Sequence, residues 1–196
     1  MPETTLAGTD AVLDGPGVPA KARRPDPLGI GRLLRTVSEA VEGDTGASAR
    51  LRRLDPEDEV GSPSLHTILA RSGHGGPRMS PDDLRRYACS VRIVAILARV
   101  GGEGRGMHPG AAFAEMEVSE QRLARLSTAR DEALQDLLTG LVRRAASTGV
   151  RMNPWALCEA ILGEARDDGV GEAARRDILF AYYRVLDART HAKTAA

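Results

Sequence analysis

Apolar residues recur at every third or fourth position along most of the chain after residue 27. In residues 28–41, for example, Leu33, Val37 and Val41 fall on one side of a helix, and Arg35 and Glu39 stand four residues apart. Alternating β-branched runs are missing, whereas Leu, Ala, Arg and Glu abound, which favours helix. We therefore predict an all-α protein, a compact bundle of about eight helices. Its helical segments are 28–41, 48–54, 80–100, 109–116, 131–147 and 172–189, with others that start near residues 62, 119 and 153.

Local signals mark where these helices begin. Ser62-Pro63 and Ser80-Pro81 each place a capping serine before a proline at the first helical position, and Ser119 caps the helix that follows it. Residues 1–27 hold five prolines and little apolar surface, so they predict a flexible tail. Residues 28–196 then form the helical domain, and the Gly-rich link at 101–106 separates two candidate lobes, 28–106 and 107–196.

Residues 80–100 predict a central, mostly buried helix, because apolar side chains surround nearly all of it. One strip stays charged: Arg85, Arg92 and Arg99 recur every seven residues and stand about 10 Å apart along the axis. Such a strip either tracks the phosphates of a nucleic acid or forms the solvated edge of a buried helix. Both interpretations remain open from the sequence.

Further arginines occur in three places. Arg50, Arg52 and Arg53 lie in a short helix, directly before the acidic run Asp55, Glu57, Asp58 and Glu59. Either these arginines pair with the acidic run, or they form a cluster that faces outward. Arg122 and Arg125 share one side of the helix that Ser119 caps, and Arg130 follows it. The outer face of 131–147 holds Glu132, Asp136, Thr139 and Arg143, so Arg144 on its flank is the better candidate for a functional contact.

Composition limits the classes of function. The chain of 196 residues carries 27 basic and 27 acidic side chains, so bulk charge does not predict a nucleic-acid-binding protein. Nearly all the positive charge is arginine, which suits planar phosphate contacts. Aromatic residues make up 3%, so the core consists mainly of Leu, Ala, Val and Ile, and the lone Trp155 is expected to be buried.

No catalytic or metal-binding motif is present. The four histidines lie in different segments and pair with no cysteine or carboxylate at ligand spacing, and no phosphate-binding loop or nucleophile elbow occurs. We therefore predict no enzymatic activity, no cofactor and no metal. Cys89 and Cys158 are interpreted as buried thiols in a reducing cytoplasm, and no segment is long and apolar enough to span a membrane.

The order of these motifs resembles a known family. Residues 48–70 combine a basic pair, an acidic Pro-containing segment and a short apolar helix. Then come Gly110-Ala111-Ala112-Phe113-Ala114, Ser119-Glu120-x-Arg122, Leu123 with Leu126, the junction Ala129-Arg130-Asp131, a long Leu-rich helix, and Trp155 followed by Ile161-Leu162. This series is similar to the small subunit of type I-E CRISPR Cascade, the CasB family, over roughly three quarters of the chain. The Pro-rich tail, the link at 101–106 and the lack of a Trp near Gly163 depart from it.

The resemblance implies an all-α, cytoplasmic subunit without enzymatic activity. Two copies would lie along a complex guided by crRNA, in contact with its backbone subunits, its large subunit and the displaced single strand of target DNA. The candidate phosphate contacts are Arg50, Arg52, Arg53, Arg122, Arg125 and Arg130, with Arg85, Arg92, Arg99 and Arg144 as further candidates. Because aromatic residues are few, binding is expected to be electrostatic and independent of sequence.

Two other functions remain open. A helix-turn-helix regulator would use the helix after Ser119 and the long helix that follows it to bind duplex DNA. A helical adaptor would have no contact with nucleic acid at all.

Overall fold

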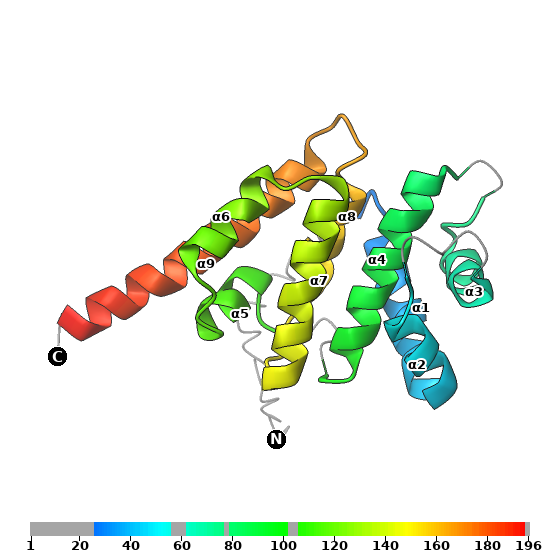
Figure 1. Ribbon diagram of the computed structural model, residues 1–196, viewed down its shortest axis with the longest axis horizontal. Coiled ribbons are helices and arrows are strands. Elements are labelled where there is room, and N and C mark those ends of the chain that lie inside the picture. Colours follow the sequence, from blue (N-terminus) through cyan, green and yellow to red (C-terminus); the bar gives the residue numbers. More distant parts are fainter. Residues whose placement is uncertain (1–25, 56–61, 77–78, 102–105, 195–196) are drawn as a thin grey trace, which may run out of the picture.

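The computed structural model describes residues 26–55, 62–76, 79–101 and 106–194, and within these ranges it consists of helices joined by turns and loops, with one isolated bridge between Met107 and Met152 (Figure 1). The predicted tail lies almost wholly outside the described residues, as does most of the acidic run after Asp55. The described helices are α1 (Ile30–Gly43), α2 (Thr45–Arg52), α3 (Pro63–Ser72), α4 (Pro81–Ala98), α5 (Pro109–Glu115), α6 (Glu120–Thr128), α7 (Asp131–Thr148), α8 (Trp155–Leu162) and α9 (Val170–Thr194). The predicted fold class is confirmed.

Serine caps fix the starts of three helices where the sequence placed them. The hydroxyl oxygens of Ser62, Ser80 and Ser119 accept from backbone N–H groups in the first turns of α3, α4 and α6, at 3.4, 3.1 and 3.3 Å. Helix α1 begins two residues later than predicted. Asp26 instead caps it with both carboxylate oxygens, which accept from the N–H groups of Ile30 and Gly31 at 2.7 and 2.9 Å.

Helix α4 is the axis of the molecule. Its residues 88–97 are all buried, and it contacts α1, α2, α7 and α8, which confirms the prediction of a central buried helix. One apolar cluster lies between α4 and helices α5 to α9, and a second lies between α4, α8 and helices α1 to α3. The two clusters therefore share α4 and α8, and the division into two lobes stays a prediction.

Close backbone contact joins α5 to α9. Gly110 faces the backbone of α9 so closely that a β-carbon there would collide with the carbonyl oxygen of Ile178. Nearby, the buried Tyr182 donates its hydroxyl to the carbonyl of Val118 at 2.6 Å. Helix α9 then continues past this contact as an arm that leaves the body of the molecule (Figure 1).

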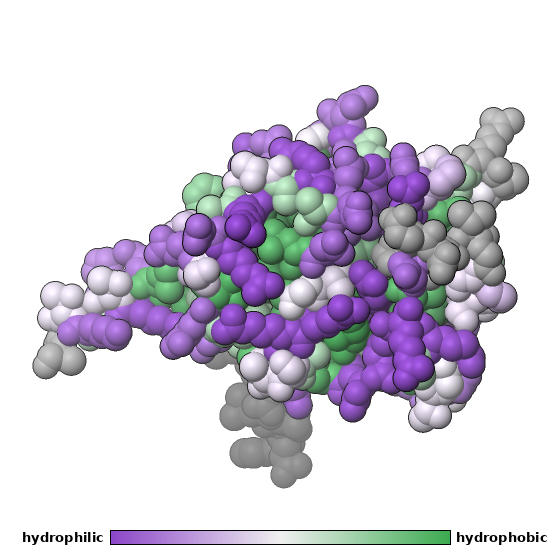
Figure 2. All heavy atoms as spheres, viewed as in Figure 1, coloured by the Kyte–Doolittle hydropathy of each residue, from purple (hydrophilic) through white to green (hydrophobic). Residues whose placement is uncertain are grey.

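The surface seen in Figure 2 is mostly polar, with apolar atoms visible between helices. Trp155 is only half-buried: it packs against the second cluster, and the edge of its indole ring lies beside Gly31. None of the described helices combines the length and apolar character that crossing a membrane requires.

Candidate nucleic-acid interface

Arg92 does not belong to an exposed strip. Its side chain is buried, with 9% of the residue exposed, and its guanidinium donates to the carbonyl of Leu54 and to the hydroxyl of Thr139, both at 3.1 Å. Thr139, placed by the sequence on the outer face of α7, is itself buried, because α4 covers this side of α7. The predicted row of three exposed arginines is therefore wrong at its middle residue.

The other two members of that row differ from each other. Arg85 is about half exposed and pairs with Asp82, with 3.4 Å between Nη2 and Oδ1. Arg99 forms the C-terminal cap of α4, is exposed, and has no ion pair with any residue the structure describes. Only the C-terminal end of α4 therefore presents an arginine without a carboxylate beside it.

The three arginines of α2 are only partly available. Arg50 pairs with Asp44 at 3.3 Å. The N–H groups of Gly46 and Ala47, and more weakly Arg50 itself, lower the pKa of the Asp44 carboxyl, so it stays ionised. Arg52 donates its Nε to the carbonyl of Ser48 at 3.1 Å. Arg53 is exposed and has no ion pair within the described ranges.

Helix α6 presents two arginines to solvent. Leu123 and Leu126 bury its inner face, so Arg122 and Arg125 lie on the outside, and both are exposed. The Nη2 atom of Arg122 lies over α7, 3.3 Å from the point where a β-carbon of Gly140 would stand. Neither arginine has a carboxylate partner in the described part of the chain.

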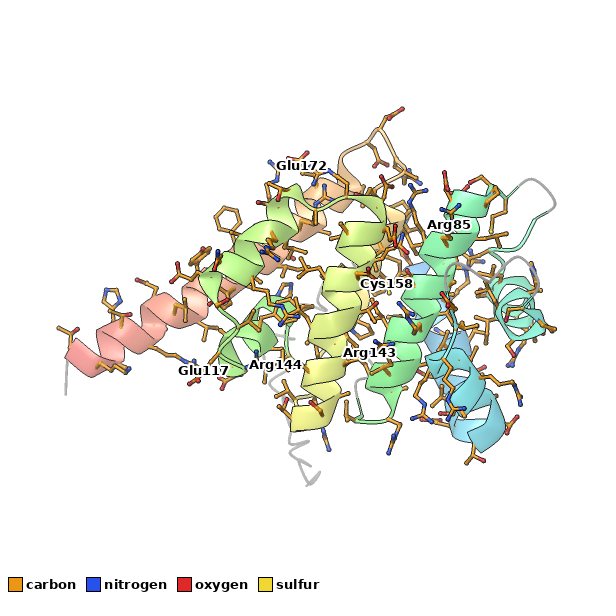
Figure 3. All side chains as sticks on the ribbon, in the orientation of Figure 1. Arg85, Glu117, Arg143, Arg144, Cys158 and Glu172 are labelled. Atoms are coloured by element: carbon orange, nitrogen blue, oxygen red, sulfur yellow. The ribbon has the colours of Figure 1, made fainter. Side chains whose placement is uncertain are left out.

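The arginines around α7 separate into two kinds. Arg130 is exposed, but its Nη1 donates to the carbonyls of Ser127 and Ala129 at 3.0 and 2.8 Å, which closes the turn before α7. Arg144 donates to the carbonyl of Met116 at 2.6 Å. Arg143 has no such bond to a described residue and points towards the α4 side of α7 (Figure 3), so it is a candidate that the sequence argument set aside.

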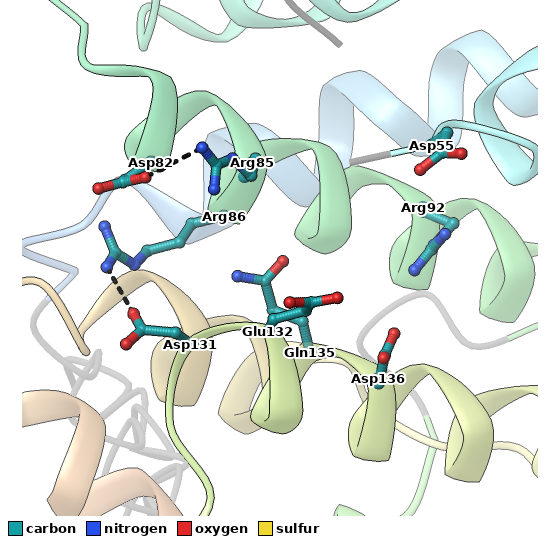
Figure 4. Close-up of a pocket in the computed structure, with 9 residues that line it drawn as sticks. All are labelled: Asp55, Asp82, Arg85, Arg86, Arg92, Asp131, Glu132, Gln135 and Asp136. Carbon is teal, nitrogen blue, oxygen red and sulfur yellow. Dashed lines mark hydrogen bonds and ion pairs between the residues drawn. The ribbon is translucent and has the colours of Figure 1, made fainter. Parts of the chain in front are cut away.

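Acidic side chains gather near the N-terminal ends of α4 and α7. A cavity of about 490 Å³ lies between the N-terminal halves of α4 and α7. Its lining comprises Asp55, Asp82, Arg85, Arg86, Arg92, Asp131, Glu132, Gln135 and Asp136 (Figure 4). In a helix-turn-helix protein the start of the second helix enters the DNA groove. Here that start carries Asp131 and Glu132, which phosphates would repel.

The described residues hold no group of three potential metal ligands among His, Cys, Asp and Glu. Both cysteines are free and buried, and burial raises the pKa of each thiol. His108 caps α5 and lies 3.2 Å from Asp177, where it joins α5 to α9. These groups are therefore accounted for by packing and capping.

Comparison with known proteins identifies the family. The family model for CRISPR-associated protein Cse2 matches residues 47–183, well over half of the chain and nearly all of α2 to α9. No significantly similar curated protein or solved structure was found. All ten predicted contact arginines lie inside the matched segment, whereas the Pro-rich tail and the whole of α1 lie before it. The chain therefore belongs to the Cse2 (CasB) family of structural small subunits of the type I-E CRISPR complex Cascade.

Proposed function

We propose that this subunit stabilises the R-loop of a crRNA-guided complex by contacts to the displaced DNA strand that do not depend on its sequence. It makes these contacts while bound to the backbone and large subunits and to a second copy of itself. It performs no chemistry on the strand. Replacing a DNA duplex by an RNA–DNA duplex is nearly balanced in free energy, so a few phosphate contacts are enough to shift the equilibrium.

The observation that carries this proposal is the state of Arg122 and Arg125. Both are exposed on α6, three residues apart, and neither is neutralised by a carboxylate of the described chain. A guanidinium in that state gains more from a phosphate than one already paired, as Arg50 is with Asp44. Arg53, Arg99 and Arg143 share this availability and are the next candidates.

The experiment is R-loop formation by the assembled complex with the double variant R122A/R125A. Phosphate contacts to a single strand release counterions, so each lost contact should reduce the log–log slope of affinity against salt by up to about 0.7. The displaced strand should also become more reactive to single-strand probes. A matched control is R71A/R166A, which removes two exposed arginines that already pair with Glu39 and Asp168.

Unchanged R-loop stability in R122A/R125A, with the subunit still present in the complex, would contradict the proposed contact. A clear preference of the free subunit for one duplex sequence would instead support the helix-turn-helix alternative.

A further inference from the structure

The groove between α4 and α7 keeps two carboxylates that no residue in the described part of the chain neutralises. Three of its five acids are engaged. Asp82 pairs with Arg85 at 3.4 Å, Asp131 pairs with Arg86 at 3.0 Å (Figure 4), and Asp55 has an interaction of its own. Glu132 and Asp136 remain. Both are exposed, and neither has an ion pair or hydrogen bond to any residue in the described ranges.

The spacing of these two carboxylates suits a cation. They stand four residues apart on α7, so they lie on the same side of the helix, about 6 Å apart along its axis. An arginine or lysine side chain laid across this turn can reach both. Gln135, between them in sequence, is mostly buried and also lines the groove.

The far wall is formed by buried arginines whose hydrogen bonding is incomplete. Arg92 lines the groove with 9% of its surface exposed, and its Nε finds no acceptor in the described structure; the buried Nε of Arg86 is in the same state. Buried donors without partners are uncommon in finished protein interiors. These Nε atoms are closed off from solvent, and the guanidinium groups are held by Asp131, Leu54 and Thr139, so neither arginine neutralises Glu132 or Asp136.

Neither nucleic acid nor a metal fits this groove. Five acids against three arginines give the lining a net negative charge, which repels phosphates. No cluster of potential metal ligands is found among the described residues. Because the chain belongs to a family of Cascade subunits, neighbouring proteins supply the remaining class of occupant.

We propose that this groove is an assembly site, which receives an arginine or lysine side chain from a different protein subunit of the complex. The basic group lies between Glu132 and Asp136 and fixes how the subunit is seated. This proposal needs only family membership and does not depend on any contact with the displaced strand.

Assembly without target DNA tests it. The variant E132K/D136K should bind the complex lacking its small subunit at least about tenfold more weakly than wild type, because it places like charges opposite the incoming cation. The variant E132Q/D136N, which keeps the shapes, should show a smaller loss in the same direction. The matched control is E172K/D187K, which also reverses one acid in the first turn of a helix and one further along it, on α9; it should bind like wild type.

A photo-crosslinking residue at position 132 identifies the occupant. Crosslinking to another protein subunit supports the proposal. Crosslinking to a second copy of this chain or to nucleic acid overturns it, as does wild-type assembly of E132K/D136K or an equal loss in E172K/D187K. Since no target DNA is present, failure here leaves the proposed strand contact untouched, and failure of R122A/R125A to weaken the R-loop leaves this site untouched.

Discussion

Replacing Arg92 with methionine separates a structural role from a role in strand binding. The residue joins three parts of the fold, since it projects from α4 and donates to Leu54, after α2, and to Thr139 on α7. Methionine is similar in length and apolar, so Arg92→Met removes both bonds and the charge without opening a large cavity.

The expected loss of stability follows from what the substitution leaves behind. The Leu54 carbonyl and the Thr139 hydroxyl each lose a charged donor, and an unsatisfied buried polar group costs about 1–3 kcal/mol. Part of this loss is offset. The guanidinium of Arg92 is buried without a carboxylate at ion-pair distance in the described chain, so removing the guanidinium also removes the free-energy cost of desolvating its charge. The Thr139 hydroxyl also keeps a weak contact of 3.7 Å with the Cys89 sulfur. We expect a net loss of about 2–4 kcal/mol in the free energy of unfolding.

Thermal unfolding measures this directly. For a chain of this size, 1 kcal/mol shifts the midpoint by roughly 2–4 °C, so Arg92→Met should lower it by roughly 4–16 °C. At a temperature where the variant is folded, its complex should form R-loops with the salt dependence of wild type. A variant with an unchanged midpoint but a shallower salt slope would refute the reasoning, since that is the result expected of a phosphate contact.

Two further predictions concern buried groups. Glu164→Ala should lower the free energy of unfolding by about 3–5 kcal/mol in chemical denaturation, because it removes the carboxylate that lies 3.4 Å from the buried Arg175 and leaves that guanidinium without its partner. The double variant Glu164→Ala/Arg175→Met should recover much of the loss, and the absence of any recovery would contradict a stabilising ion pair here. Because burial raises the pKa of the Cys89 and Cys158 thiols, neither should react with an aromatic disulfide reagent at mildly alkaline pH until the protein unfolds, when both should react; rapid labelling of the native protein would contradict this.

The features that the sequence predicted correctly are those set by near neighbours. A serine before a helix, a proline at its first position and acids in its first turn act within four residues, so the starts of α3, α4 and α6 followed directly. The burial of α4 was also readable, because apolar residues surround it. Helix α9 was harder to delimit: the polar residues after 189 gave no apolar spacing, yet the helix continues to Thr194.

The features that it could not predict depend on which segments meet. Arg92 and Arg99 are equivalent by spacing, yet one is buried and the other exposed, because α7 and the chain after α2 cover the middle of α4 but not its end. Arg143 and Arg144 were ranked by the charges of their own helix. Whether each guanidinium is bonded depends instead on another segment, since the carbonyl that Arg144 binds belongs to Met116, in the link between α5 and α6.

The distribution of charge along α4 and α7 has an origin in helix electrostatics. Both helices begin with acids, Asp82 and Asp83 in α4 and Asp131 and Glu132 in α7, and such acids stabilise the positive end of a helix dipole. Arg86 contacts Asp131, and further along α4, Arg92 contacts Thr139, which also lies further along α7. The two helices therefore run parallel (Figure 1).

Parallel packing brings like ends together. At the acidic end, the resulting repulsion is reduced by Arg86, which lies within 3.5 Å of Asp83 and 3.0 Å of Asp131. At the other end, Arg99 and Arg143 have no described carboxylate to offset them. A chain of zero formal net charge therefore acquires an acidic groove, to which Asp55 after α2 also contributes, and a basic end. In the two proposals above, the acidic groove receives a basic side chain from a protein neighbour, and the basic end supplies Arg99 and Arg143, two of the further candidates for contact with the DNA strand.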